Sequence, residues 1–232
     1  MSSPRVRALL FGFEDSPLLD EINTLAATLR SIGWTVNQFW LPTTDYKKAN
    51  VIVESALGQD LPADNSHDTL FVYYGGYALQ DPTNLANPCA KLKWHAKCQH
   101  VVVILHCPFN FDTYPDWPDK MFKTESPPNF TMQYVALPAP ATEVKLGRTG
   151  FDCVAQGCRT GEIVEVPQVF SGLPTTLMGN MIGGWNESEN LTVEKFVQRL
   201  TVQGGGNLGG MPFWHGPKGK ASDVVLRGGI GD

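Results

Sequence analysis

The chain has 232 residues, of which 42% are hydrophobic and 18% charged, and its formal net charge is −5 at pH 7. This length and composition suit one globular domain with a full-sized core, so we expect a single domain over 1–232. The acidic balance, without a local cluster of Lys or Arg, argues against nucleic acid as a partner.

The five cysteines, at 89, 98, 107, 153 and 158, are odd in number and scattered. This pattern fits reduced thiols better than a disulfide framework. No stretch approaches the length of a membrane span, and the apolar run 8–13 is shorter than the core of a signal peptide. We therefore expect a cytoplasmic protein that makes no contact with membranes.

A run rich in His and Cys extends from Cys89 to Cys107 and raises the question of a zinc site. It contains no CxxC pair, and its second half, from His100 onward, lies largely within a predicted strand, which would spread the ligands over two faces. We therefore expect no metal site and no cofactor.

The first third of the chain alternates strand and helix patterns. An apolar strand over 6–13 is followed by a helix that Ser16 and Pro17 open and Gly33 closes, with apolar residues at helical spacing. A second strand covers 34–41. Thr44 is expected to cap a second helix, which stops at Gly58.

Two continuous apolar runs, 69–74 and 101–105, are typical of parallel strands that are buried on both faces. A helix around 90–98 is expected to link them. The composition then shifts to Pro, Asp and aromatic residues, which predicts a long loop over 108–130.

The C-terminal half predicts a strand over 132–137, a hairpin over 151–166 and a short helix over 175–182. Thr192 is expected to cap a last amphipathic helix. The glycine-rich stretch 204–222 is interpreted as a flexible loop that leads to a strand over 223–226. The alternation of strands and helices predicts an α/β fold in three layers, with a mostly parallel central sheet flanked by helices.

The chain carries no GxxxxGK[ST] and no GxSxG motif, which argues against P-loop enzymes and the usual serine hydrolases. "GGGNLGG" follows a helix instead of opening one, so no helix N-terminus is placed to receive a phosphate.

Two strand ends carry a family resemblance. The strands end in "YYGGYA" and "ILHCPFNF", and the chain resembles the caspase and metacaspase family of cysteine peptidases, in which they end in "YYSGHG" and "ILDCCHSG". Weaker echoes occur in "RALLFGFEDSP", "VALPAPATEV" and "LTVEKFVQRL", so that the resemblance covers most of the chain. It implies a caspase-like fold.

The resemblance also implies where the catalytic dyad of that family would lie. The His of SGHG falls on Tyr77, and the nucleophilic second Cys of DCC falls on Pro108. A phenol with a reference pKa of about 10 does not exchange protons near neutrality as imidazole does. Proline lacks both the thiol and the backbone N–H that would stabilise an oxyanion. The sequence therefore predicts no peptidase activity.

Two alternatives would still allow the protein to be an enzyme. Cys107 and His106 are adjacent, but successive strand residues point to opposite faces, so only a bulge at the strand end would bring the two side chains together. His106 is expected to line the cleft on the face of Pro108, and Cys107 to be a core thiol. Tyr77 either serves some different chemistry or fills the cleft as an aromatic plug.

The features that give this family its specificity differ as well. His106 stands where basic-specific metacaspases have an acidic residue, so a pocket there would not favour Arg or Lys. The calcium-binding stretch of the family is reduced to "LQDPTNLANP", in which Asp81 is the only charged residue.

We interpret the chain as an inactive caspase-like pseudopeptidase that binds or regulates a protein or peptide partner, for which another caspase-like protein is one candidate. The alternative is an enzyme of another reaction class that uses the same cleft through His106, Cys107 or Tyr77. The residues expected to form the cleft are Gly75, Gly76, Tyr77, His106, Cys107, Phe109 and Phe111.

Overall fold

The computed structural model describes residues 5–59, 69–75, 100–106, 131–136, 173–204, 213–215, 222 and 224–229. Six strands form one sheet in the order β2-β1-β3-β4-β5-β7. They are β1 (Val6–Phe13), β2 (Thr35–Leu41), β3 (Thr69–Gly75), β4 (His100–His106), β5 (Thr131–Ala136) and β7 (Phe213–His215). The first five are parallel and β7 is antiparallel, so the chain has the mostly parallel α/β sheet that the sequence predicts.

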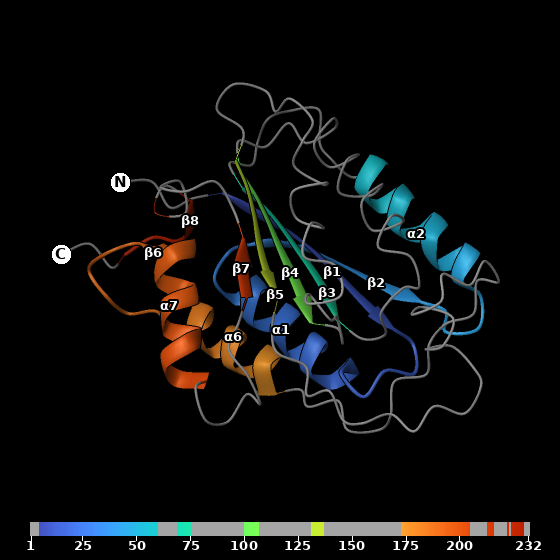
Figure 1. Cartoon of the computed structure of the whole chain (residues 1–232), viewed down its shortest axis with the longest axis horizontal. Coiled ribbons are helices and arrows are strands. Elements are labelled where there is room, and N and C mark those ends of the chain that lie inside the picture. The colour runs from blue at the N-terminus through green and yellow to red at the C-terminus, as the bar shows by residue number, and fades with distance from the viewer. Residues whose placement is uncertain are drawn as a thin grey trace.

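Helices flank both faces of this sheet. They are α1 (Leu19–Ser31), α2 (Tyr46–Gln59), α6 (Leu173–Gly183) and α7 (Val193–Gly204). The chain passes from β1 out to β2 and then back across β1 to β3, so right-handed crossovers put α1 and α2 on opposite faces. Figure 1 shows this arrangement, with α1, α6 and α7 on one side and α2 on the other. Among the described residues, no helix combines the length and apolar character needed to cross a membrane.

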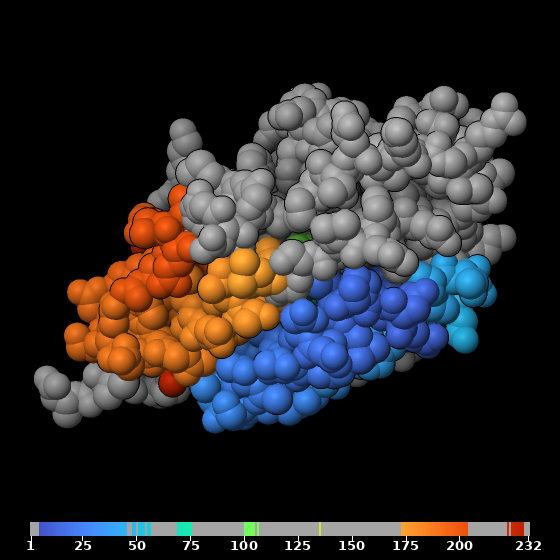
Figure 2. All heavy atoms as spheres, turned by 90° about the horizontal axis from the view of Figure 1, so that it is seen from below, coloured from blue at the N-terminus to red at the C-terminus, as the bar shows by residue number. Residues whose placement is uncertain are grey.

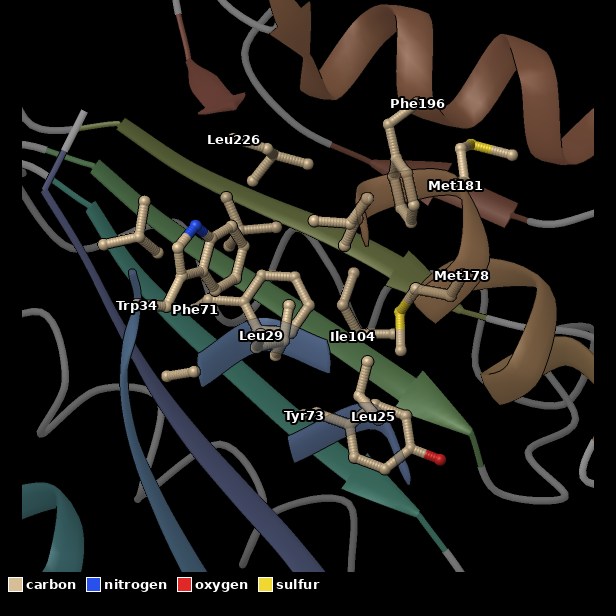
Figure 3. Close-up of a cluster of buried hydrophobic side chains, with 14 of the residues drawn as sticks. Leu25, Leu29, Trp34, Phe71, Tyr73, Ile104, Met178, Met181, Phe196 and Leu226 are labelled. Carbon is tan, nitrogen blue, oxygen red and sulfur yellow. The ribbon is translucent and has the colours of Figure 1, made fainter. Parts of the chain in front are cut away.

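The main core lies between the sheet and the layer of α1, α6 and α7, whose surfaces lie side by side in Figure 2. The sheet contributes alternate residues, among them Leu10, Phe71, Tyr73 and Ile104, because successive side chains of a strand point to opposite faces. Figure 3 shows several of these side chains packed against Met178 of α6 and Phe196 of α7.

Helix α1 approaches the sheet closely at one glycine. A Cβ at Gly12 would lie 2.6 Å from Ile22 Cδ1 and 2.8 Å from the Trp40 ring, so only glycine leaves room for both side chains. The buried residues of α1 recur at helical spacing, as the sequence predicts: they are Ile22, Leu25, Ala26 and Leu29.

The opposite face of the sheet holds a second packing layer, in which aliphatic side chains surround two pairs of aromatic rings. Phe11 stacks on Phe39 with ring centroids 5.1 Å apart, and Phe13 meets Tyr74 edge to face at 6.1 Å. On α2 the buried described side chains are small or β-branched: Ala49, Val53 and Ala56. Both faces of the central strands are thus buried, which explains their continuous apolar sequence.

The two N-caps predicted for α1 and α2 are wrong. The Ser16 hydroxyl accepts from Leu18 N–H at 3.1 Å and so closes a short turn, and α1 begins after this turn at Leu19. In α2, Asp45 replaces the expected Thr44, because Asp45 Oδ1 accepts from Lys48 N–H at 3.0 Å. Gly33, with φ of 88°, ends the turn after α1 as predicted.

The C-terminal helices are fixed by capping contacts. Thr192 Oγ1 accepts from Lys195 N–H at 3.3 Å, which confirms the predicted cap of α7. Arg227 donates to the carbonyl oxygens of Ile182 and Gly183 at the end of α6, where a cation is favourable. Arg227 belongs to β8 (Val225–Arg227), which pairs antiparallel with β6 (Leu191–Thr192).

One expectation is wrong within the stretch 204–222. Strand β7 lies inside the region predicted to be a flexible loop and pairs with β5, with Val135 opposite Trp214. Three residues between glycine-rich segments are too few for a recognisable alternation, so pairing with β5 decides their conformation. The predicted helix 90–98, the loop 108–130 and the hairpin 151–166 lie outside the described residues.

Candidate functional site

Strands β3 and β4 are parallel neighbours, and their C-terminal ends lie at the same edge of the sheet. The last pair in their register joins Gly75 to His106. Parallel α/β sheets bind ligands and perform chemistry outside the carboxyl ends of their strands. The residues that end β3 and β4 are therefore the candidate site, and the positions of Tyr77 and Pro108 follow two residues later in each chain segment.

Tyr73 extends along β3 toward this edge. A Cβ at Gly75 would lie 2.5 Å from the Tyr73 hydroxyl oxygen, so the glycine leaves the space that the phenol fills. Figure 3 shows the ring beside Ile104, with its hydroxyl directed to the ends of the strands. The side chain has no exposed surface.

Thr175, in the first turn of α6, completes a buried polar group at the strand ends. Its hydroxyl oxygen lies 2.6 Å from the Tyr73 hydroxyl and 2.8 Å from His106 Nδ1, and these last two atoms are 3.2 Å apart. Thr175 and His106 are both 0% exposed. We call Tyr73, His106 and Thr175 the strand-end cluster.

Burial determines the charge of this cluster. Because desolvation penalises an imidazolium, the pKa of His106 falls from 6.5 to about 3. The ring is consequently neutral at physiological pH. The two hydroxyl groups and Nδ1 form a row of neutral hydrogen bonds. In one arrangement the Thr175 hydroxyl donates to Nδ1 and accepts from the Tyr73 hydroxyl. In the other, Nδ1–H donates to Thr175, which donates to Tyr73.

This arrangement holds three elements together but is poorly suited to acid–base catalysis. A general base works best when its pKa lies near the operating pH, and His106 titrates far below it. The cluster ties the first turn of α6 to the ends of β3 and β4 in a dry environment, where each hydrogen bond is strong. Its main effect is to fix the geometry of the strand ends.

Two of the predicted cleft residues, Gly75 and His106, belong to this site. The structure places them side by side on adjacent strands, with His106 fully buried. The others lie outside the described residues, so the expected cleft stays a prediction: Gly76, Tyr77, Cys107, Phe109 and Phe111, together with Pro108. Within the described ranges, no three His, Cys, Asp or Glu side chains gather to hold a metal ion.

The sequence interpretation missed Tyr73 and Thr175. The signal for Tyr73 is its position two residues before Gly75, because residues i and i+2 share a face of the strand. A glycine there leaves space for the preceding aromatic ring. Thr175 gives only a weak signal, because it is one of two threonines in the first turn of the helix "LPTTLMGNMIG" and the sequence does not show which of them is buried.

No protein-family model matches the chain, and no curated protein matches it. The role of the site is therefore inferred from its residues and their geometry.

Proposed function

We propose that this protein is a catalytically inactive caspase-like domain that binds or regulates a protein partner at the carboxyl ends of β3 and β4. The mostly parallel sheet with helices on both faces supports a fold of this class, although the same architecture serves many functions. More specific support is the adjacency of β3 and β4, since the two segments that resemble the family's catalytic strand ends run side by side.

The burial of His106 carries the inactive part of this proposal. Cysteine peptidases need a base that takes up and returns a proton near neutral pH. With its pKa lowered to about 3, His106 does not serve as that base. Tyr77 and Pro108 supply neither imidazole nor thiol, so the strand ends offer no replacement for the dyad at the family's positions.

The binding part rests on the residue types that follow the strand ends. Tyr77, Phe109 and Phe111 are aromatic, and aromatic side chains contribute strongly to protein interfaces. The rigid strand-end cluster would present these segments from a fixed base. A peptide or protein that offers apolar side chains suits such a surface better than a basic peptide.

Peptide cleavage tests the absence of activity. We expect no turnover of peptides that contain Arg, Lys or Asp before the scissile bond, with or without calcium. Turnover that disappears in Cys107→Ala would show that Cys107 is a nucleophile and that the protein is a peptidase.

A rebuilt dyad tests the family assignment. In Tyr77→His with Pro108→Cys, an imidazole beside the new thiol should lower its pKa, so that alkylation becomes faster at lower pH than in Pro108→Cys alone. Pro108→Cys alone is the matched control, because it carries the same five native cysteines as the double variant. If Tyr77→His leaves the pH dependence of labelling unchanged, the two positions are not close and the caspase-like assignment fails.

A displayed peptide library tests binding. The wild-type protein should enrich peptides with apolar anchors, and the double substitution Phe109→Ser and Phe111→Ser should lose them while circular dichroism shows an intact fold. Enrichment that is equal in both proteins would place the binding surface elsewhere.

A further inference from the structure

Strand β2 forms one end of the sheet (Figure 1), and in the described part of the chain no strand pairs with its outer edge. Its sequence, TVNQFWL, contains no charged residue and no proline. Natural edge strands usually carry Lys, Pro or a bulge, which prevent pairing with another chain. The register with β1 runs without interruption, so β2 lacks these devices within its own residues.

The backbone of β2 presents alternate residues to the outside. Leu41 O accepts from Glu14 N–H at 3.1 Å, just beyond the end of β1, so the backbone groups of Leu41 face β1. Residues at even spacing from Leu41 also face β1, and the intervening ones face outward. The outward residues are therefore Val36, Gln38 and Trp40.

A side chain from α1 covers the middle of this edge. Arg30 Nη2 donates to Val36 O at 3.2 Å and to Gln38 Oε1 at 2.9 Å. Gln38 Nε2 in turn donates to Asn23 Oδ1 at 2.9 Å. We call Arg30, Gln38 and Asn23 the edge cluster. All of its hydrogen bonds are exposed to solvent, so it holds the edge only weakly.

With Arg30 displaced, the outer edge of β2 would match a second copy of itself. In an antiparallel pair about a two-fold axis at Gln38, Gln38 lies opposite its counterpart and Val36 lies opposite Trp40 of the second copy. Three such pairs of outward residues would exchange about six backbone hydrogen bonds. Val36 and Trp40 are half-buried against the main core, and pairing would cover more of their apolar surface.

We propose that the outer edge of β2 is a strand-pairing surface for a second copy of this chain, and that Arg30 keeps it closed. Arg30 occupies Val36 O, which the second strand needs. It also puts a positive charge beside the axis in each copy, and like charges across paired strands are unfavourable. This inference does not depend on the proposed function of the strand ends.

Sedimentation of Arg30→Met tests the proposal, because methionine keeps the helix propensity and the apolar stem but removes the charge and the donors. The wild-type chain and Arg199→Met, which loses a half-buried arginine of α7 that pairs with Glu187, should remain monomers. Arg30→Met should double in mass with rising concentration, and adding Gln38→Lys should return it to a monomer. Arg30→Gln is a second variant for which the same result is expected.

Cross-linking tests the register. With Arg30→Met, an added Gln38→Cys should form a disulfide across the axis, since directly paired strand residues lie at a distance that a disulfide spans. Thr35→Cys should not, because its counterpart would be about 20 Å away. Arg30→Met without a new cysteine is the control for the native thiols. A monomeric Arg30→Met that is folded by circular dichroism, or a dimer insensitive to Gln38→Lys, would overturn the proposal.

Discussion

The strand-end cluster and the edge cluster are built alike but lie in opposite environments. Each joins three polar side chains from a helix and the sheet through short contacts. The strand-end cluster is fully buried, whereas the edge cluster is exposed. Water can replace a lost partner at the edge but not at the strand ends, so the same kind of contact should differ greatly in its effect on stability.

Burial decides how much each cluster can contribute to the free energy of unfolding. A buried polar group that loses its partner costs about 1 to 3 kcal/mol, while an exposed ion or amide contact is worth well under about 1 kcal/mol. The strand-end cluster should therefore determine the stability and geometry of the β3 and β4 ends. The edge cluster should leave stability nearly unchanged and control association instead.

The largest expected effect comes from Gly75→Ala. The new methyl group would meet the Tyr73 hydroxyl, which Thr175 and His106 hold in place, so we expect a loss of about 3 kcal/mol in the free energy of unfolding. Urea denaturation measures it. In a Tyr73→Leu background the same substitution should cost far less, and an equal cost in both backgrounds would show that Tyr73 does not fill this space.

The pH dependence of stability is expected to be the next largest effect. Because the pKa of His106 is about 3 in the folded state and 6.5 when unfolded, only the unfolded chain binds this proton between those values. The contribution is fully present above pH 6.5 and declines as pH falls toward 3. At pH 5 the loss relative to pH 7 should be about 2 kcal/mol.

His106→Asn provides the control for this pH dependence. Its amide lies near the position of Nδ1 but does not titrate, so the variant should be less stable at pH 7 yet show a shallower decline between pH 6.5 and 5. A decline as steep as that of the wild type would assign it to other groups.

A smaller effect is expected for Thr175→Val, which keeps the side-chain shape and removes the hydroxyl. The Tyr73 hydroxyl and His106 Nδ1, 3.2 Å apart, remain hydrogen-bonded to each other. The expected loss in the free energy of unfolding is therefore about 1.5 kcal/mol, less than two fully unsatisfied groups would give. Thermal or urea unfolding measures it. A neutral result would mean that water enters the site and that the cluster is not dry.

The smallest effect is expected at the edge. Asn23→Ala removes one member of the edge cluster and should change the free energy of unfolding by no more than about 0.5 kcal/mol. Measured beside Thr175→Val, it compares the two environments directly. A cost as large as that of Thr175→Val would remove the distinction between the clusters.

The general fold was predictable because it depends on local patterns. The apolar spacing of α1 and the continuous apolar runs of β1, β3 and β4 predict the elements that the structure contains. The order of strand and helix patterns then predicts a parallel sheet. From this sheet follows the placement of Gly75 and His106 at neighbouring strand ends.

The strand-end cluster was not predictable because it depends on distant contacts. Thr175 lies 102 residues from Tyr73 in sequence, and no local pattern indicates that α6 would place its first turn over β3. The burial of His106 has the same origin, since its sequence position alone is compatible with a cleft. Strand β7 likewise forms through pairing with β5.

Nuclear magnetic resonance titration of His106 tests the central claim most directly, which is that the histidine at the strand ends is neutral and unable to act as a base. The signal is assigned by its loss in His106→Asn. We expect its chemical shifts to stay constant from pH 8 to pH 5 while the protein remains folded, because the pKa lies at about 3. A titration midpoint near 6.5 in the folded protein would contradict this account and return His106 to the candidates for catalysis.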